Sequence, residues 1–392
     1  MHPFSLFVSN MTLPRQQDHR FPSYHRVMNH IQQERGAGHN PPATPDDDFV
    51  SPQPHDPPRQ PHCEICGTKQ SLTRCTGCHV AFYCSKHPEG SGRSAHDLPC
   101  VDIQRALDNL NRDARQLGNE LLGPDVLINP FAITGPDFLP FPPYRLLWDC
   151  RSLPDYKLAR LRLVQKLLVL KRTDAVESAL RHLKCMLPYD KHDEMGLSQM
   201  IPALLLRLGR DQRCYNFLKW FSYRQSCHER FHLLSFIELH KADVLERVTH
   251  LPSLGYCIPL TLLKIRLFLD LQAMQYTTLL ISRLVPQEIH DNIRACCTDG
   301  DALATRILRE HDLSPRIEKL RRQIERLIED VHRANKFFWP MLLNPGSNLS
   351  AVSFVCPPST LEEAQIILQH NYDSWLETRG AIALVKTLKT NL

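Results

Sequence analysis

A run of cysteines and histidines between residues 63 and 100 constrains this chain more than any other feature. Its pattern is C-x2-C-x8-C-x2-C-x5-C-x2-H-x8-H-x3-C, formed by Cys63, Cys66, Cys75, Cys78, Cys84, His87, His96 and Cys100. Zn²⁺ takes four Cys or His ligands in a tetrahedron, and ligands two residues apart can reach one ion from a tight turn. A segment of about 40 residues is too short to bury a sufficient apolar core. Metal therefore has to supply its fold, and eight ligands predict two closed zinc sites.

Disulfide bonds are the alternative use for so many cysteines. No hydrophobic signal segment opens the sequence, because His, Arg and Gln recur throughout residues 1–50. Without secretion thiols stay reduced, and closely paired cysteines then indicate metal binding rather than disulfides. We therefore expect an intracellular protein, in the nucleus or the cytoplasm.

The segment RCTGCHVAFYCS (residues 74–85), with the histidine and the H-x3-C that follow, resembles the MYND-type zinc finger. Fingers of that family hold two zinc ions in interleaved coordination, in which the first and third ligand pairs share one ion. The resemblance implies two ligand sets: Cys63, Cys66, Cys84 and His87 for one ion, and Cys75, Cys78, His96 and Cys100 for the other. It also implies a protein partner, since these fingers bind short proline-containing peptides.

Two departures from the family pattern fall after the fifth ligand. Only Ser85 and Lys86 separate Cys84 from His87, where the family usually has three residues. The family then continues with a short helix, whereas residues 88–95 read PEGSGRSA and are rich in helix breakers. The zinc sites are therefore the firmer expectation and the peptide groove the weaker one. His62 and His79, each beside a cysteine that already fits, are interpreted as surface histidines.

Composition divides the chain into four parts. Residues 1–60 hold ten of the 30 prolines and no sustained apolar period, which predicts a disordered tail rich in Pro and His. Residues 62–101 are the predicted finger, and residues 102–149 a linker with a helical start. Residues 150–392 show helical periodicity without a convincing strand pattern. The predicted fold is an all-α body, built as a helical-hairpin array, that carries a small two-zinc finger.

Helix signals in the body predict eight helices, at about residues 156–170, 174–186, 198–208, 211–221, 259–274, 286–295, 314–338 and 362–370. Ser359 and Glu362 have the spacing of a capping box for the last of them. Two hairpins share their spacing, because Leu170, Arg172 and Leu180 recur 38 residues later as Leu208, Arg210 and Leu218. That offset is near the period of helical-hairpin repeats. Two copies leave both a true repeat and a simple run of helices open.

The body carries a second resemblance. The segments VPQEIHDNIR (285–294), HRANKFFWPMLLNP (332–345) and YDSWLETRGAI (372–382) are similar to a group of fungal MYND-finger proteins with an all-helical body. The resemblance implies that the finger and the body evolved as one unit. It implies little about activity, because that group is largely uncharacterised.

Enzyme signatures are missing from the sequence. The SET-and-MYND lysine methyltransferases need a Gly-rich cofactor segment before the finger and an Asn-His-Ser-Cys motif after it, and neither is present. A prolyl hydroxylase needs His-x-Asp and a distal His on a β-barrel, which the helical pattern excludes. No P-loop, dinucleotide fingerprint or Gly-x-Ser-x-Gly elbow occurs either. We expect no catalysis, and a divergent methyltransferase-like enzyme is the alternative.

Charge and hydropathy narrow the range of partners. A net charge of +5 over 392 residues is mild, and no basic stripe of the kind that binds nucleic acid is visible. No apolar stretch reaches the roughly 18 uncharged residues of a membrane span. The sequence therefore predicts a zinc-binding, non-catalytic interaction or adaptor protein with an unidentified protein partner. Because MYND proteins often act in nuclear complexes, transcriptional regulation is one setting that the resemblance implies.

Overall fold

The computed structural model describes residues 62–90, 97–122, 150–187, 193, 195–226, 242–248, 251, 253–280, 312–351 and 357–389. The predicted tail, the second part of the predicted linker and the predicted helix at 286–295 lie outside these residues. So does His96, one of the eight predicted ligands.

The finger is built on a short hairpin. Strands β1 (Leu72–Arg74) and β2 (Phe82–Cys84) pair antiparallel, with Thr73 opposite Tyr83. The polypeptide then enters α3 (Asp97–Leu122), which carries Cys100 in its first turn. This helix crosses the expected boundary between finger and linker at residue 101. The last predicted ligand of the finger therefore belongs to the first helix of the body.

The body is all-helical, as the sequence predicts. Its further elements are α6 (Leu153–Val169), α7 (Thr173–Met186), α8 (Leu197–Arg207), α9 (Asp211–Ser226), α10 (Leu254–Leu280), α13 (Ser314–Ala334), α14 (Phe338–Leu343), the 3-10 helix η4 (Gly346–Ser350), α15 (Leu361–Glu377) and α16 (Ala381–Lys389). Each helix from α3 to α9 packs against the next described helix along the sequence.

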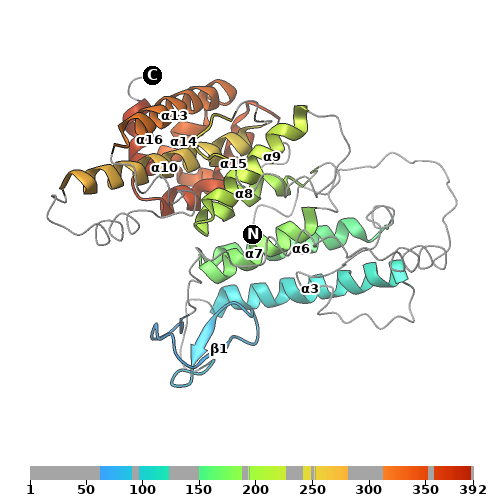
Figure 1. The fold of residues 1–392 in the computed structure, drawn as a ribbon. Coiled ribbons are helices and arrows are strands. Elements are labelled where there is room, and N and C mark those ends of the chain that lie inside the picture. The colour runs from blue at the N-terminus through green and yellow to red at the C-terminus, as the bar shows by residue number, and fades with distance from the viewer. Residues whose placement is uncertain are drawn as a thin grey trace, which may run out of the picture.

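The helices form two groups in space (Figure 1). Helices α3, α6 and α7 lie side by side, with the finger at the N-terminal end of α3. The other group is formed by α8, α9, α10 and the helices from α13 to α16. One apolar core runs through the described part of the protein and includes Val80 and Tyr83 of the finger with Ile103 of α3 and Leu163 of α6. The finger and the body are thus packed together.

The two hairpins that share a sequence spacing also share a turn. Helices α6 and α8 end at Val169 and Arg207, and α7 and α9 begin at Thr173 and Asp211, so all four boundaries keep the 38-residue offset. Each turn contains one residue with a left-handed backbone, Lys171 with φ 50° and Gly209 with φ 71°. Gly209 has no Cβ to oppose that conformation, and Lys171 takes it up in the equivalent place.

The arginine that follows each left-handed residue reaches back to the preceding part of the fold. Arg172 forms an ion pair with Glu64 of the finger. Arg210 forms one with Glu177 of α7, at 2.8 Å. The second hairpin is therefore fastened to the first in the way that the first is fastened to the finger.

Helix α10 is buried along most of its described length, and it carries charged side chains in the interior. Arg266 donates to the carboxylate of Asp211 at 3.1 Å and to the carbonyl of Leu206 at 3.0 Å. Burial lowers the pKa of Lys264 to about 7, and its amine donates to the carbonyl oxygens of Val244 and Glu246. Within the described residues, no helix combines the length and the apolar character needed to cross a membrane.

The pattern predicted as one helix over 314–338 is divided in the structure. Asn335 is extended, with φ −154° and ψ 103°, and separates α13 from α14. Its side-chain amide donates to the carbonyl of Thr360 at 2.8 Å and to Glu363 at 2.9 Å. These contacts come from the region where α15 begins, so the break depends on tertiary packing that periodicity along the sequence does not report.

The predicted capping box is displaced by one residue. The N-cap of α15 is Thr360, not Ser359, and its side-chain oxygen accepts from the backbone N–H of Glu363 at 3.3 Å. Glu363 in turn accepts from the backbone N–H of Ser359 at 2.8 Å. Ser359 has a φ of 65° and lies before the helix. The reciprocal pattern exists, with Glu363 in place of Glu362.

The displaced cap gives a stability prediction. Replacing Thr360 by Ala should lower the free energy of unfolding by about 1 kcal/mol, because an orphan N–H of the first turn loses its acceptor. Ser359→Ala is the matched control and should change it by less than half as much. Urea unfolding followed by circular dichroism measures both. Equal losses in the two variants would contradict the assignment of Thr360 as the cap.

Candidate functional site

Four of the predicted ligands meet in a first cluster. The ligand atoms of Cys63, Cys66, Cys84 and His87 all lie within 4.8 Å of one another. The Sγ atoms of Cys66 and Cys84 are 3.7 Å apart, and Cys84 Sγ is 3.5 Å from His87 Nδ1. Zinc bond lengths of about 2.3 Å to sulfur and 2.0–2.1 Å to nitrogen give tetrahedron edges of about 3.5–3.8 Å. A disulfide would bring two sulfurs to about 2.0 Å. The donor set and its spacing therefore fit a zinc ion.

Local turns bring these ligands together. The backbone N–H of Gly67 donates to the carbonyl of Cys63 at 2.9 Å, and Gly67 has a φ of 71°, which closes the turn between the first two cysteines. A second tight turn joins Cys84 to His87, whose N–H donates to the Cys84 carbonyl at 3.0 Å. The shortened link between the fifth and sixth predicted ligands is thus long enough for His87 to reach the cluster.

Backbone donors prepare the first cluster for metal. Burial raises the pKa of the Cys63 thiol, but hydrogen bonds from the backbone of Cys66, Ile65 and Cys84 outweigh it and lower that pKa to about 6. Only the thiolate binds zinc. At neutral pH this sulfur is therefore available in the form that a metal needs.

Three further ligands form a second cluster. The sulfur atoms of Cys75, Cys78 and Cys100 lie within 4.8 Å of one another, and Cys75 Sγ is 3.5 Å from Cys100 Sγ. A Cβ at Gly77 would lie 3.0 Å from Cys100 Sγ, so a glycine there leaves room for the helix to bring its thiol close. These thiols suit a zinc ion as well. The predicted fourth ligand, His96, lies outside the described residues.

Glu89 is a neighbour of the second cluster that the ligand spacing in the sequence does not assign to it. Its carboxylate accepts from the Cys75 thiol at 2.9 Å, and from the backbone N–H and the hydroxyl of Thr76 at 2.9 and 3.0 Å. Burial raises the pKa of the Cys75 thiol, and the hydrogen bond to Glu89 adds to the shift. An acidic residue close behind His87 is the only sequence signal that could have pointed to it.

His62 and His79 are exposed and belong to neither cluster. His79 has a φ of 59° in the turn between the two strands, where its N–H donates to the carbonyl of Cys75 at 3.1 Å. Its position is that of a turn residue and not of a ligand.

Both clusters are connected to the body. Glu64, between the first two ligands, forms the ion pair with Arg172, and both side chains are mostly buried. Cys100 of the second cluster is part of α3, which packs along α6. The position of each cluster is therefore linked to the packing of the helices.

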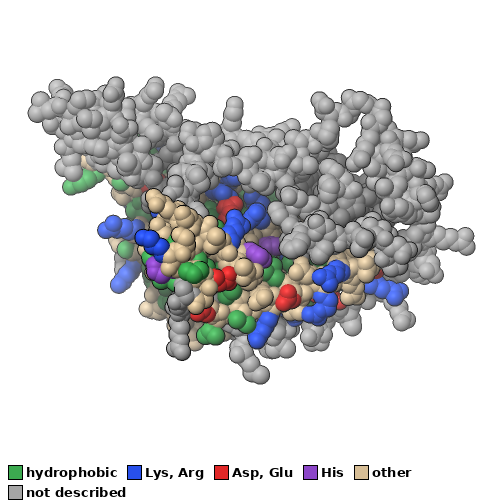
Figure 2. Space-filling view, turned by 90° about the horizontal axis from the view of Figure 1, so that it is seen from below, with side chains coloured by type: hydrophobic (Ala, Val, Ile, Leu, Met, Phe, Trp, Pro, Cys, Tyr) green, Lys and Arg blue, Asp and Glu red, His purple; other side chains and the backbone are tan. Residues whose placement is uncertain are grey.

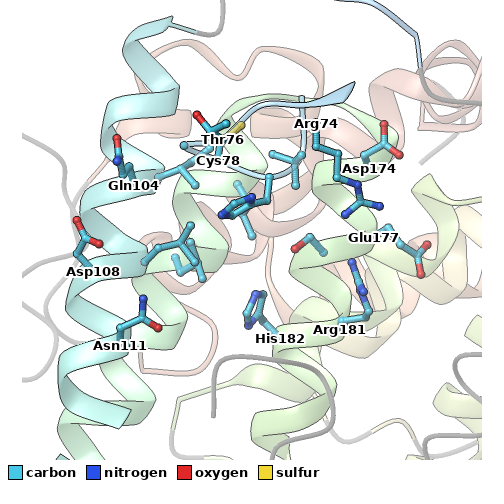
Figure 3. A pocket seen from close by; sticks show the side chains of 18 of the residues that line it. Arg74, Thr76, Cys78, Gln104, Asp108, Asn111, Asp174, Glu177, Arg181 and His182 are labelled. Carbon is cyan, nitrogen blue, oxygen red and sulfur yellow. The ribbon is translucent and has the colours of Figure 1, made fainter. Parts of the chain in front are cut away.

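A cavity of about 490 Å³ opens where the finger meets α3, α6 and α7 (Figure 3). Its apolar lining comes from both sides, and consists of Val80, Phe82, Ile103, Leu107, Leu163 and Leu167. Charged and polar groups complete the wall, among them Arg74 of the finger, Asp108 of α3, and Arg181 and His182 of α7. No feature of the sequence pointed to this cavity, because its walls are far apart along the polypeptide.

His182 is held as a neutral imidazole. Burial lowers its pKa well below the usual 6.5, and the charges of Arg160 and Arg181 lower it further. Arg160, which is fully buried, donates from Nε to His182 Nδ1 at 3.0 Å. Because Nδ1 accepts, the ring hydrogen is on Nε2. His182 is therefore a hydrogen-bond donor in the cavity wall.

Comparison with known proteins gives one short match. No family model matches the sequence, and no solved structure is significantly similar to it. The protein is similar to Egl nine homolog 1 of Homo sapiens, with 38% identity over 56 residues. The similarity is local. It covers 14% of this chain and 13% of that protein, so the match spans only a small fraction of the relative's length.

The two clusters predict the metal content. Wild-type protein should bind two zinc ions per molecule, and His87→Ala should weaken one of them strongly, because one of four ligands in the first cluster is lost. His79→Asn is the control: asparagine tolerates the left-handed backbone, and both ions should remain. Metal analysis and a competition titration with a chromophoric chelator measure this. One ion or none in the wild-type protein would exclude the two-site interpretation.

The neutral His182 predicts a pH dependence of stability. An unfolded histidine binds a proton below about pH 6.5, whereas folded His182 does not until a much lower pH. Below pH 6.5 the unfolded state therefore binds more protons, and this contribution to stability is lost as pH falls.

The variant His182→Asn, which keeps an acceptor for Arg160, should lack that loss. The difference between the wild-type and variant free energies of unfolding should shrink between pH 7.5 and 5.0. This difference in the free energy of unfolding can decrease by at most about 1.4 kcal/mol for each pH unit below 6.5. Urea unfolding at several pH values measures it, and a difference independent of pH would refute the neutral imidazole.

Proposed function

We propose that this protein is a non-catalytic interaction protein, in which a MYND-type finger folded by two zinc ions is fixed to a helical scaffold and recognises a partner protein. The observation that carries the proposal is the interleaving of the two clusters. The first and third ligand pairs meet in one, and Cys75, Cys78 and Cys100 meet in the other. Interleaving of this kind is the arrangement that the resemblance to MYND fingers implies.

The connection of finger and body supports a recognition role. A finger held by α3 and by the Glu64–Arg172 ion pair presents a defined surface, and rigid presentation lowers the entropic cost of binding. The match to Egl nine homolog 1 is confined to 56 residues, a length that suits a small module. The partner that we propose carries a short peptide motif, and proline-containing peptides are the first to test. The resemblance to fungal MYND-finger proteins with a helical body also favours a finger and a helical body that act as one unit.

The surface favours a protein over a nucleic acid as the partner. On the face shown in Figure 2, Lys and Arg side chains lie among Asp and Glu side chains over the described residues. A nucleic-acid site usually gathers its basic residues on one face or stripe. The described cysteines are free thiols, which supports a reducing compartment, and we propose the nucleus or the cytoplasm. Transcriptional regulation is the setting that we propose to examine first.

One specific observation favours the alternative, a methyltransferase-like enzyme: the cavity wall contains groups with shifted pKa values. Burial raises the pKa of Asp174 and lowers that of His182, and shifted pKa values gather at catalytic sites. The partner of His182 Nδ1 argues against catalysis, because the guanidinium of Arg160 opposes the imidazolium form that a general base must reach. Transfer of a labelled methyl group from S-adenosylmethionine to protein substrates, lost in His182→Asn, would favour the enzyme instead.

Partner capture tests the proposed function. Proteins bound by the tagged full-length protein should be lost in the double variant Cys63→Ser, Cys66→Ser, because the first zinc site can no longer form. Cys257→Ser is the matched control, since Cys257 belongs to neither cluster, and it should retain them. Quantitative mass spectrometry identifies the proteins, and metal analysis confirms the zinc content of each variant. An unchanged set of partners in the zinc-deficient double variant would contradict a finger-dependent interaction.

A further inference from the structure

The cavity at the junction borders the second metal cluster, because Cys78 is one of its lining residues, and most of its wall is made by residues of neither cluster. Its walls come from the finger and from three helices of the body, so it exists only while the finger is docked on α3 and α7. Its volume of about 490 Å³ lies within the range of small-ligand sites, which are mostly apolar pockets with a few placed polar groups.

The guanidinium of Arg181 has a buried donor without an acceptor. Its Nε is buried and has no hydrogen-bond partner, and none of the described carboxylates forms an ion pair with the side chain. A buried donor without an acceptor costs free energy, and more so when it is charged. A group brought from outside could supply that acceptor.

The side chains that face the cavity are donors. Figure 3 shows Arg74 directed into the cavity from the finger, and Arg181 and His182 directed into it from α7. The Arg74 guanidinium lies 5.4 Å from the centre of the Phe82 ring, so it spans the apolar wall. Arg160 fixes the ring hydrogen of His182 on Nε2.

The acidic residues of the wall are placed differently. Figure 3 shows Glu177 and Asp108 directed away from the centre of the cavity. The Glu177 carboxylate is already paired with Arg210 at 2.8 Å. Asp174 is close enough to Arg172 and Arg74 for both to lower its pKa, although burial raises it by more. Arg181 therefore offers a ligand a charge that has no carboxylate partner among the described residues, whereas Arg74 lies close to Asp174.

We propose that this cavity binds a peptide carboxylate next to an apolar side chain, supplied by a partner protein. A guanidinium matches a carboxylate with two parallel hydrogen bonds, and Arg181 provides that group. His182 adds a neutral donor. The apolar side chain would lie against Val80, Leu163 and Leu167, which line the cavity. This site rests on the proposed function, and it names the chemistry of a partner that the metal clusters do not.

A carboxylate of this kind has two sources, the free C-terminus of a peptide or an Asp or Glu side chain. Full-length, zinc-loaded protein is therefore screened against two random hexapeptide libraries on beads, one with free and one with amidated C-termini. Peptides with a carboxylate beside an apolar residue should be enriched. Enrichment in the free library alone assigns the C-terminus, and enrichment in both assigns the side chain.

Variants then identify the site with the best peptide, by fluorescence polarisation. Arg181→Gln should weaken binding by about tenfold or more, the effect of losing a hydrogen bond to a charged group. Arg181→Lys keeps the positive charge but cannot form the two parallel hydrogen bonds of a guanidinium. Its affinity for the peptide should lie between those of the wild-type protein and Arg181→Gln. Asp108→Asn should preserve or tighten binding, because it removes a negative charge from the wall. Arg333→Gln, on the exposed face of α13, is the control and should change nothing.

Several outcomes would overturn the inference: no enrichment of carboxylates, enrichment of basic peptides, or binding that Arg181→Gln leaves unchanged while zinc content and melting temperature stay at wild-type values. The proposed function fails independently, when partner capture survives loss of the first zinc site. Cysteine-dependent capture combined with no carboxylate binding would reject the cavity site and leave the interaction protein in place.

Discussion

The two clusters of cysteine and histidine ligands, whose geometry suits zinc, are the constraint on which the rest of this structure depends. The finger has few apolar side chains of its own, and zinc in small fingers supplies on the order of 10–16 kcal/mol of apparent binding energy. Cys100 extends that constraint beyond the finger, because this ligand is also a first-turn residue of α3. Through α3 the second cluster sets where α6 packs, and through Glu64 the first cluster meets Arg172 of the body. The cavity between finger and α7 is a product of the same two connections.

The candidate metal sites could be predicted from the sequence because their information is local. Two ligands separated by two residues can reach one ion only if the backbone between them forms a tight turn. The turns at Gly67 and between Cys84 and His87 are formed by backbone hydrogen bonds within each turn. Glu89, Arg172 and Arg181 could not be assigned in that way. Each acquires its role from a partner or a wall that packing brings close. Nothing in the spacing of an arginine along α7 shows that its Nε will be buried without an acceptor.

Helix boundaries likewise could be predicted where their signals are local and could not where they depend on tertiary contacts. The ends of α6 and α8 and the starts of α7 and α9 lie within one residue of their predicted places, since turns and caps there are written in neighbouring residues. The break at Asn335 was not foreseen, because it is stabilised by contacts at the start of α15. The cap shifted from Ser359 to Thr360 because the backbone takes a left-handed residue just before the cap. Both cases are decided by backbone geometry that a polar pattern alone does not specify.

The equivalence of Arg172 and Arg210 gives the stack of helices a direction. Each hairpin reaches backward with an arginine, the second onto Glu177 of the first and the first onto Glu64. In this one contact the finger stands to the first hairpin as the first hairpin stands to the second, while α3 is the element that packs along α6. A segment that is folded by metal, as we propose for the finger, has a consequence that a helix in its place would lack. The contact between Glu64 and Arg172 would then depend on zinc supply, so metal availability could affect how the first hairpin is held.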